Sequence, residues 1–212
     1  MNIDIVILWV DGSDPSWLEE KRKYLPPAAK DSASANRYRD WGLLPYWFRC
    51  IEKNAPWVRK VHFVTWGHVP AFLNLDTPKL NVVKHTDFIP AEYLPTFNSH
   101  TIEMNIHRIP DLAEHFIYFN DDMFLLRPMS EKDFFRNGLP CTYGREVPWV
   151  FRGEVGIWSH AAANDLGVIN AHFSNVAIPH QIAMLEQQTR ELKALSLDIL
   201  NLAKQAKEWL RI

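Results

Sequence analysis

A nearly continuous run of β-branched and other apolar residues, Ile3 to Val10, most constrains how this chain can fold. A run without polar alternation is typical of a strand buried on both faces in a parallel sheet. Further segments at 60–65, 81–84, 116–119 and 123–126 have strand character. Segments with helical spacing at 17–24, 43–54 and 100–107 lie between the predicted strands. The sequence therefore predicts an α/β, Rossmann-like fold, with a mostly parallel sheet flanked by helices and ligands at the carboxyl ends of the strands.

The composition limits the class of protein. With 212 residues, of which 47% are hydrophobic and 23% charged, the chain is expected to form one globular domain with room for an appendage. The net charge of −2 gives no general basic field, so nucleic-acid binding is not expected. Cys50 and Cys141 are far apart and have no further ligand at metal-binding spacing, which argues against zinc and favours a reduced, cytosolic setting. The run at Ile3 to Val10 is too short for a signal peptide or a membrane span.

Two adjacent carboxylates follow the apolar run that ends at Phe119. Asn120, Asp121 and Asp122 interrupt this run before apolar residues resume at Met123. Carboxylates beside a buried strand are costly unless they are paired, hydrogen-bonded or bound to a cation. Because Mg²⁺ and Mn²⁺ prefer oxygen ligands, the pattern predicts a site for one of these ions at Asp121 and Asp122. The alternative is a polar turn, in which Asn and Asp are common.

The C-terminal part of the chain has a different character. Residues 182–212 contain no Gly or Pro and are rich in helix formers, so one long amphipathic helix is expected there. Residues at alternating spacings of three and four form an apolar stripe along this helix, in which only Gln188 is polar. The stripe consists of Leu185, Gln188, Leu192, Leu195, Ile199, Leu202, Ala206 and Trp209. The stripe has three candidate roles: packing on its own domain, self-association or a partner helix, and peripheral contact with a membrane. We accordingly predict a domain at 1–178 and a helix at 179–212.

Five segments, in their order and spacing, carry a resemblance to one protein family. They are Asp4 to Pro15, Arg37 to Asp40, Ile51 to Val61, Leu94 to Pro110 and Asn120 to Asp122. From Met1 to about Phe135 the chain closely resembles the first two conserved regions of the Stealth family. These are sugar-1-phosphate transferases that include bacterial capsular polysaccharide phosphotransferases and the lysosomal-enzyme GlcNAc-1-phosphotransferase.

The resemblance implies a glycosyltransferase-A-like fold and a phosphotransferase of capsule or exopolysaccharide biosynthesis. Such an enzyme would move hexose-1-phosphate, in the first instance N-acetylhexosamine-1-phosphate, from a UDP-sugar to a hydroxyl of a polysaccharide or glycolipid, and release UMP. The negative charge of the diphosphate must then be matched by Mg²⁺ or Mn²⁺ and by fixed donors, while a base removes the proton of the acceptor.

The family pattern and the chemistry of the residues together give candidate phosphate and metal ligands. Asp121 and Asp122 are the predicted metal ligands, and Asp122 is also assigned a catalytic role. Arg37 and Arg39 can bind phosphate oxygens, because the guanidinium group matches them in a bidentate way. Arg39 is preferred for catalysis, since the neighbouring Asp40 can orient it. The alternative is that both are surface arginines paired with Asp40.

The remaining candidates lie at the end of the first strand and on a predicted helix. Asp11 and Gly12 can contact uridine or ribose through a carboxylate and a close backbone approach, although a plain strand-ending turn has the same composition. Glu103 and His107 are four residues apart, so on one helix they share a face and can point together at the acceptor hydroxyl. Glu103 matches a family position with the role of base or acceptor contact. The alternative for His107 is a core histidine in contact with Arg108.

The third and fourth conserved regions of the family are not recognised in this sequence, and His172 or His180 gives too short a match to carry a role. Two other interpretations therefore stay open. One is a non-catalytic or partner-dependent subunit that binds a nucleotide sugar, and the other is a conventional metal-dependent glycosyltransferase that releases UDP. The expected location is the cytoplasm, and peripheral contact with the inner face of the membrane is a further option.

Overall fold

The computed structural model describes residues 1–24, 38–141 and 157–172. They belong to two compact units, Met1–Thr142 and Tyr143–Ile212. Arg37, the predicted boundary at 178 and the predicted helix at 182–212 all lie outside the described residues, so the boundary and the helix stay predictions.

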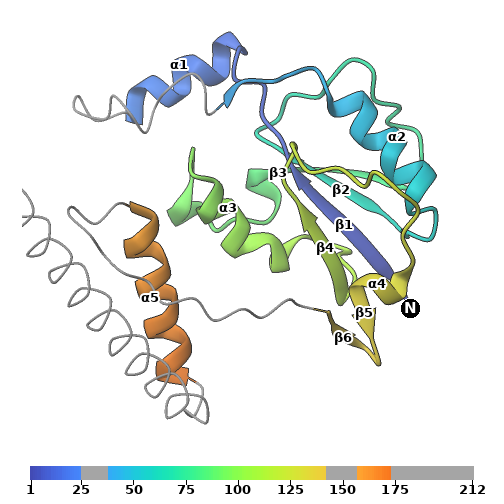
Figure 1. The fold of residues 1–212 in the computed structure, drawn as a ribbon. Helices are drawn as coiled ribbons and strands as arrows, with labels where there is room; N and C mark the ends of the chain where they lie inside the picture. Colours follow the sequence, from blue (N-terminus) through green and yellow to red (C-terminus); the bar gives the residue numbers. More distant parts are fainter. Residues whose placement is uncertain (25–37, 142–156, 173–212) are drawn as a thin grey trace, which may run out of the picture. The chain divides into compact units, whose positions relative to one another are not determined.

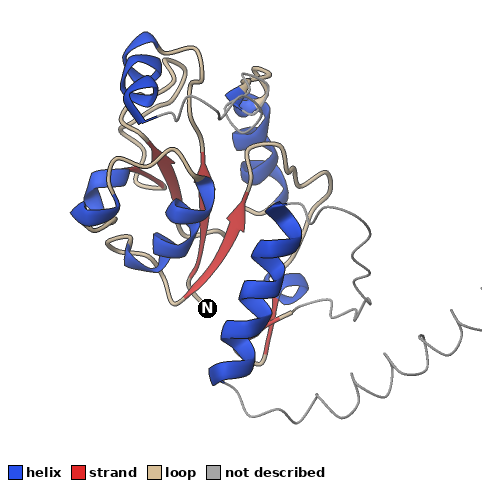
Figure 2. Ribbon diagram, turned by 90° about the vertical axis from the view of Figure 1, so that its left-hand side faces the viewer, coloured by secondary structure: helices blue, strands red, loops and turns tan. Residues whose placement is uncertain are grey.

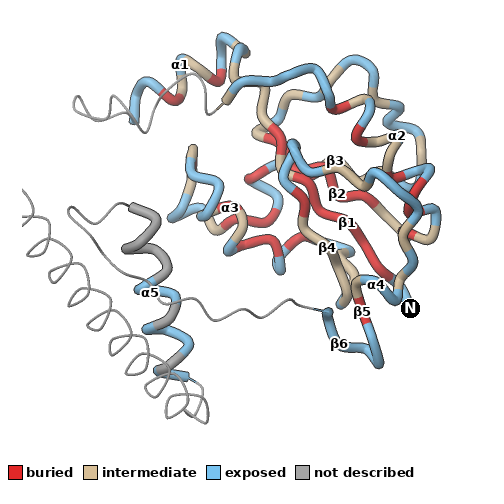
Figure 3. The backbone as a smooth tube through the Cα atoms, viewed as in Figure 1, coloured by how far each residue is buried: buried red, intermediate tan, exposed pale blue. Residues whose placement is uncertain are grey.

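Four parallel strands form the sheet of the first unit: β1 Ile3–Leu8, β2 Val61–Thr65, β3 Leu80–Lys84 and β4 His115–Phe119. Their order is β3-β2-β1-β4, so β1 is a central strand (Figure 1). Ile5 of β1 pairs with Val61 of β2 on one side and with Ile117 of β4 on the other. β1 and β2 are buried nearly throughout (Figure 3), as is typical of parallel strands that are covered on both faces. The predicted parallel α/β fold is confirmed.

Helices cover both faces of this sheet, so that it forms a middle layer (Figures 1 and 2). On one face, α2 Leu44–Asn54 packs Trp47 and Ile51 against the side chains of Ile5 and Ile7. On the other face, α3 Ser99–Asn105 and the 3₁₀ helix η4 Ile106–Arg108 contribute apolar side chains to a second cluster, which is built around Val6 and Val64. The two clusters alternate along β1 because successive strand side chains point to opposite faces.

The first helix, α1 Pro15–Tyr24, begins directly after the turn that ends β1. Pro15 is well placed in a first turn, where a missing N–H costs nothing. Asp14 Oδ1 accepts a 2.9 Å hydrogen bond from the backbone N–H of Trp17, which satisfies one of the free donors of the helix start. The helix buries Trp17 and Lys21. The helix predicted at 17–24 is confirmed and begins two residues earlier.

A charged residue, Asp4, is completely buried in β1. Its carboxylate accepts hydrogen bonds from Arg59 Nε at 2.8 Å, from the N–H of Ala113 at 2.8 Å and from His62 Nε2 at 2.9 Å. Burial acts to raise the pKa of Asp4, but the hydrogen bonds from Arg59 and His62 outweigh it and hold this pKa below its usual value. A fully paired buried carboxylate of this kind ties β1 to β2 and to the segment before β4.

The run at 123–126 is not a strand. The N–H of Met123 bonds to the carbonyl of Asn120, which closes a turn directly after β4, and Leu126 is 87% exposed. Phe124 and Leu125 instead pack against the cluster under α2, and the side chain of Asn54 donates to the Leu125 carbonyl. The apolar residues here therefore cover the core from a loop, without sheet pairing.

The shorter elements of the first unit lie between and after these segments. They are η2 His85–Asp87, η3 Ala91–Tyr93, α4 Glu131–Phe134, β5 Phe135–Arg136 and β6 Leu139–Pro140. In the second unit the described element is α5 Ile157–His172, a segment to which the sequence analysis assigns no element. No helix among the described residues is long and apolar enough to cross a membrane.

Candidate active site

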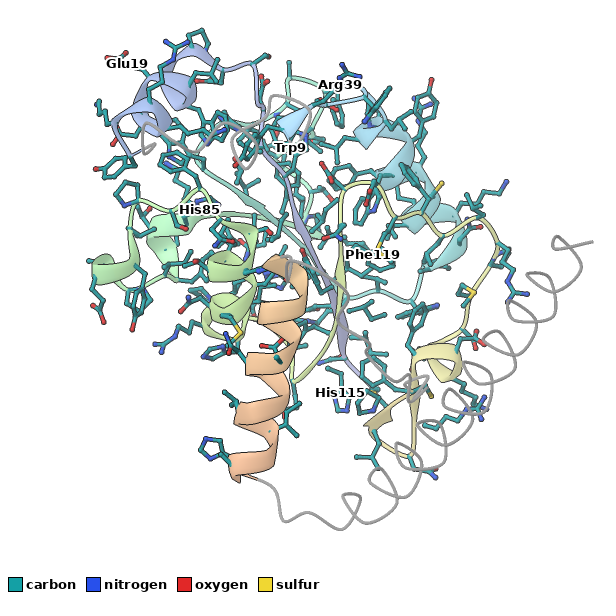
Figure 4. The ribbon with its side chains drawn as sticks, turned by 60° about the vertical axis from the view of Figure 1, so that its left-hand side comes forward. Trp9, Glu19, Arg39, His85, His115 and Phe119 are labelled. Atoms are coloured by element: carbon teal, nitrogen blue, oxygen red, sulfur yellow. The ribbon has the colours of Figure 1, made fainter. Side chains whose placement is uncertain are left out.

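The carboxyl ends of β1 and β4 are neighbours in the sheet, and the residues that follow them form the candidate site. Ile7 pairs with Phe119, so the residues after both strands emerge at the same edge. Two cavities lie here, with volumes of about 180 and 170 Å³, and Trp9 and Asp121 line both. In Figure 4, Trp9 lies between Arg39, which lines the first cavity, and His85, which lines the second.

The first cavity brings together polar side chains that are about eighty residues apart in the sequence. Arg39 and Asp40 come from the segment before α2, and Asp121 and Asp122 come from the turn after β4. Trp9 adds an aromatic wall from the end of β1. A cationic group and a carboxylate pair thus share one cavity at the strand ends, the arrangement that a metal-bound diphosphate requires.

The two adjacent carboxylates are electrostatically unfavourable for each other. Partial loss of hydration raises the pKa of Asp121, and the charges of Asp122 and Asp40 raise it further. Asp121 and Asp122 are nevertheless exposed at the mouth of the cavity, so water screens part of this effect. A cation placed beside both carboxylates would remove the repulsion and favour their ionised form.

The carboxylates fit a metal ion that is shared with a ligand rather than held by the protein alone. Within residues 1–24, 38–141 and 157–172, no group of three or more His, Cys, Asp or Glu side chains is placed to hold a metal. Mg²⁺ is commonly bound through one or two carboxylates, with phosphate oxygens and water as its other ligands. Asp121 and Asp122 match this mode, and the metal site stays a prediction.

Arg39 and Asp40 do not form the expected pair in the described part of the chain. The guanidinium carbon of Arg39 lies 5.0 Å from the ring centroid of Trp41, and Asp40 Oδ1 accepts a 2.8 Å hydrogen bond from the N–H of Gly42. Trp41 therefore supports the arginine, while Asp40 fixes the turn that leads into α2. Both side chains are exposed and remain available to a ligand.

The loop after β1 is held in place by a histidine that sequence reasoning missed. His68 Nε2 accepts a 2.8 Å hydrogen bond from the N–H of Asp11, and His68 Nδ1 lies 3.8 Å from Asp14 Oδ2. Asp11 Oδ1 accepts from both the N–H and the hydroxyl of Ser13, at 2.9 and 2.6 Å. The signal for His68 was its place in the Trp66-Gly67-His68 turn, which directly follows β2 at the same edge of the sheet.

Gly12 is required by a close approach of two chain segments. A Cβ atom at this position would lie 2.0 Å from the carbonyl oxygen of Tyr38 and 2.6 Å from its Cβ. No side chain can be accommodated there without moving the segment that carries Arg39. Gly12 thus positions the first cavity, whereas the structure leaves its predicted contact with uridine or ribose as a prediction.

Glu103 reaches the carboxyl end of β4 through a tyrosine. The Tyr118 hydroxyl lies 3.2 Å from Glu103 Oε1 and 2.6 Å from Asn120 Oδ1. Burial raises the pKa of Tyr118, and the nearby charges of Glu103, Asp121 and Asp122 raise it further, so this hydroxyl stays protonated and acts as a donor. Tyr118 therefore links the Glu103 side chain of α3 to the Asn120 turn, and sequence reasoning did not identify it.

The helix predicted at 100–107 is divided into two. Glu103 belongs to α3, which ends at Asn105, and His107 belongs to the 3₁₀ helix η4. The four-residue spacing no longer places the two side chains on one face, because a 3₁₀ turn has three residues per turn. His107 is exposed, and its side chain forms no hydrogen bond or ion pair with another described residue. Its predicted partnership with Glu103 lacks support, and its catalytic role stays a prediction.

Fold and site together define the chain as a Rossmann-like α/β protein with an acidic, arginine-bearing cleft at the carboxyl ends of its strands. Two matches then give its family. Conserved region 1 of the Stealth proteins matches residues 1–26, and conserved region 2 matches residues 37–142. The chain belongs to the Stealth family, as its sequence motifs indicate.

Curated relatives extend this similarity over most of the chain. A capsular polysaccharide phosphotransferase of Streptococcus thermophilus is 46% identical over 179 residues, which cover 82% of this chain and 73% of the relative. One of the same name from Streptococcus pneumoniae is 50% identical over 81% of this chain and 52% of the relative. An exopolysaccharide phosphotransferase of Lactiplantibacillus plantarum is 42% identical over 84% of this chain and 51% of the relative. The chain thus spans about half the length of several curated relatives that it matches.

Proposed function

We propose that this chain is a sugar-1-phosphate transferase of polysaccharide biosynthesis. It would take hexose-1-phosphate, in the first instance N-acetylhexosamine-1-phosphate, from a UDP-sugar and transfer it to a hydroxyl of a polysaccharide or glycolipid, with release of UMP. The observation that carries the proposal is the single cavity in which Arg39, Asp121 and Asp122 meet. The names of the relatives support the same reaction class.

The reaction breaks the bond between the β-phosphorus and the oxygen that bridges it to the α-phosphorus. The acceptor oxygen forms the new bond to the β-phosphorus, UMP leaves with the bridging oxygen, and the hydroxyl proton passes to a base. Charge on the transferred phosphoryl group is the main obstacle, so positioning and fixed positive charge are the main requirements.

Asp121 and Asp122 would hold Mg²⁺ or Mn²⁺ against the diphosphate. Bound there, the ion neutralises charge on the phosphate oxygens. Arg39 lines the same cavity and can donate two parallel hydrogen bonds to a phosphate group, with its guanidinium stacked near Trp41. Asp40 shapes this segment through the N–H of Gly42, and Asp11 and Gly12 shape the facing loop. We assign that loop to the uridine end of the donor.

Glu103 is the proposed base. Its carboxylate contacts the Tyr118 hydroxyl, which also contacts Asn120 in the turn that carries Asp121 and Asp122, and these contacts support the proposal. Tyr118 contacts Glu103 at Oε1 only, so Oε2 is left to accept the proton of the acceptor hydroxyl. Tyr118 is thus a positioning residue for the base.

The decisive experiment identifies the nucleotide that is released. The purified chain would be incubated with Mg²⁺ or Mn²⁺, UDP-N-acetylhexosamines or UDP-hexoses, and a capsular polysaccharide acceptor. We expect UMP, a product that Asp122→Asn abolishes and Glu103→Gln reduces about 10² to 10⁴-fold. The exposed Asp76 lies in a surface loop, and Asp76→Asn serves as the control with unchanged activity. Release of UDP would indicate conventional glycosyl transfer and overturn the proposal.

A second candidate function is nucleotide-sugar binding without independent transfer. The cavity that contains Arg39, Asp121 and Asp122 supports donor binding on either interpretation. A partner-dependent subunit that binds the nucleotide sugar would bind UDP-sugar with Mg²⁺ but release neither nucleotide alone. Restoration of UMP release by an added partner would establish this alternative.

A further inference from the structure

A lysine is buried on the inner side of α1. Lys21 is 5% exposed, and Trp17, four residues earlier on the same face of the helix, is 2% exposed. No carboxylate in the described part of the chain forms an ion pair with Lys21. Burial disfavours the charged form of this ammonium and lowers the pKa of Lys21. A buried cation without a carboxylate is costly, so other groups must compensate for its lost hydration.

Two aromatic rings take the place of a carboxylate. The ammonium nitrogen of Lys21 lies 4.9 Å from the ring centroid of Trp17 and 3.5 Å from the ring centroid of Tyr38. The two rings also contact each other, with their centroids 5.0 Å apart and their planes tilted by 59°. Because the face of an aromatic ring is negative, both rings attract the ammonium, and the attraction is stronger where water is excluded. Tyr38 is the closer of the two partners.

Tyr38 lies where the candidate site is assembled. It lines both cavities, and Arg39 follows it directly in the chain. Its carbonyl oxygen lies against Gly12, and its hydroxyl donates a 3.2 Å hydrogen bond to the carbonyl of Phe97. The carbonyl and the hydroxyl of Tyr38 are thus each fixed by a different segment. The ammonium of Lys21 adds a third contact, which is made to the ring itself.

Lys21 lines neither cavity, so any effect on a ligand must pass through Tyr38. A neutral side chain of similar length could fill the same space, but it would not attract the ring electrostatically. The ring of Tyr38 would then be held by packing and by the single hydrogen bond of its hydroxyl. Arg39 shares its backbone with Tyr38, so a change at the tyrosine changes where the guanidinium group begins.

We propose that Lys21 is a positioning residue of the nucleotide-sugar site, and that its cation–π contact with Tyr38 holds Arg39 at the first cavity. The role in ligand binding rests on the proposed function, whereas the contact between Lys21 and Tyr38 does not. A cation–π contact needs a positive charge at residue 21 and an aromatic ring at residue 38. Arginine should therefore replace Lys21 in this role, and methionine should not.

The test follows the Tyr38 ring and ligand binding separately. NMR spectra of the full chain with isotope-labelled tyrosine rings report on Tyr38, whose signals are identified by their loss in Tyr38→Leu. Calorimetric titration measures the affinity for UDP and for UDP-N-acetylglucosamine with Mg²⁺. Lys21→Met and Lys21→Gln remove the charge, and Lys21→Arg keeps it. Lys23→Met is the matched control, because Lys23 lies on the same helix but is 57% exposed and pairs with Glu20.

We expect shifted Tyr38 ring signals and roughly fivefold weaker binding of both nucleotides in Lys21→Met and Lys21→Gln. Lys21→Arg should restore the affinity, a rescue that a role in packing alone would not give. Lys23→Met should change neither the ring signals nor the affinity. Adding Lys21→Met to Tyr38→Leu should weaken binding no further, because the ring that the charge contacts is already absent.

Unchanged affinity in folded Lys21→Met and Lys21→Gln would overturn the proposal, even if their melting temperatures were lower, since Lys21 would then be a purely structural residue. Equal losses in Lys21→Arg and Lys21→Met would also overturn it, because the charge would have no role. A wild-type chain that binds neither nucleotide with Mg²⁺ would refute the proposed function and the positioning role with it. Shifted Tyr38 signals in Lys21→Met would in that case still establish the contact between the two residues.

Discussion

His68 Nε2 accepts a 2.8 Å hydrogen bond from the backbone N–H of Asp11, which ties the turn after β2 to the loop after β1. Because this nitrogen acts as the acceptor, the proton of the neutral ring sits on Nδ1, which lies 3.8 Å from Asp14 Oδ2. Asp14 in turn accepts from the first turn of α1. His68 thus holds the Asp11 loop through a hydrogen bond, and its Nδ1 lies near Asp14 without a hydrogen bond to it.

Removing this acceptor should loosen the Asp11 loop. In His68→Leu the partly buried N–H of Asp11 loses its partner, at a cost of about 1 kcal/mol, and we expect the affinity for UDP to fall roughly fivefold. His68→Gln is the matched control, since its side-chain oxygen can restore the acceptor. Calorimetric titration with UDP and Mg²⁺ measures the effect. Equal UDP affinity in the Leu and Gln variants and the wild type would show that His68 does not position the nucleotide site.

Gly12 gives a steric test of the same loop. The Cβ of Gly12→Ala would lie 2.0 Å from the Tyr38 carbonyl oxygen, so the segment bearing Arg39 must move. We expect a loss of UDP affinity together with a destabilisation of about 1 to 3 kcal/mol. Gly167 of α5 has no neighbouring atom within 4 Å of its Cβ position, and Gly167→Ala should leave binding unchanged and stabilise its helix by about 0.5 to 1 kcal/mol. If Gly12→Ala bound UDP normally, the close approach would have no role in the site.

The buried carboxylate of Asp4 should be important for stability rather than for ligand binding. Asp4→Ala leaves Arg59 and His62 without their shared partner, and breaking a buried pair of this kind costs about 3 to 5 kcal/mol. Asp111 also pairs with Arg59 but is 57% exposed, so Asp111→Ala should cost less than about 1 kcal/mol. Urea unfolding of the two variants measures this difference. Similar losses in both would mean that Asp4 is not the main partner of Arg59.

Ionised Asp121 should lower the stability of the metal-free protein and contribute to metal binding. The pKa of Asp121 is raised in the folded protein, so its ionised form opposes folding at neutral pH, and Asp121→Asn should raise the melting temperature of the metal-free chain. The same variant should lose much of the further increase that Mg²⁺ with UDP gives to the wild type. Asp76→Asn, in an exposed loop, should change neither quantity. A lower melting temperature in metal-free Asp121→Asn would contradict this account of the carboxylate pair.

Much of the sheet could be predicted from the sequence because its signals are local. The segments Ile3 to Val10 and 60–65 are rich in β-branched and apolar residues and lie near turn residues, and both contain strands. The run at 123–126 has the same local character but is a loop, because the turn after Asn120 separates it from the sheet. Pairing with the sheet depends on the direction that the chain takes after the preceding turn. A short apolar run does not encode that direction.

The site was only partly predictable for a similar reason. Asp121 and Asp122 have adjacent charges in an apolar run, a pattern that is visible in one segment. His68 and Tyr118 are connected to the predicted site residues through contacts with Asp11 and Glu103, which lie 57 and 15 residues away in the sequence. The spacing of His107 from Glu103 supports a shared face only on one continuous helix, and α3 ends at Asn105, so the catalytic role of His107 stays a prediction. Helix ends and cross-strand partners are tertiary properties.

The buried His85 should make the chain unstable in weak acid. Burial lowers the pKa of His85 to about 4, whereas a histidine in an unfolded chain titrates near 6.5, so the unfolded state binds more protons between these values. Stability should therefore be complete above about pH 6.5 and fall as the pH decreases towards 4, by up to about 3 kcal/mol for this residue.

His85→Phe isolates this effect. His62 and His68 also have lowered pKa values and contribute loss of stability in the same direction, but both are present in the wild type and in the variant. Asp4, whose pKa lies below its ordinary value, adds its own loss only in stronger acid. The difference in urea midpoint between about pH 7 and pH 5 should therefore be smaller in His85→Phe than in the wild type by an amount that corresponds to about 2 kcal/mol. An identical pH dependence in the two proteins would mean that His85 is not held neutral by burial, and that its unpaired nitrogen is open to water.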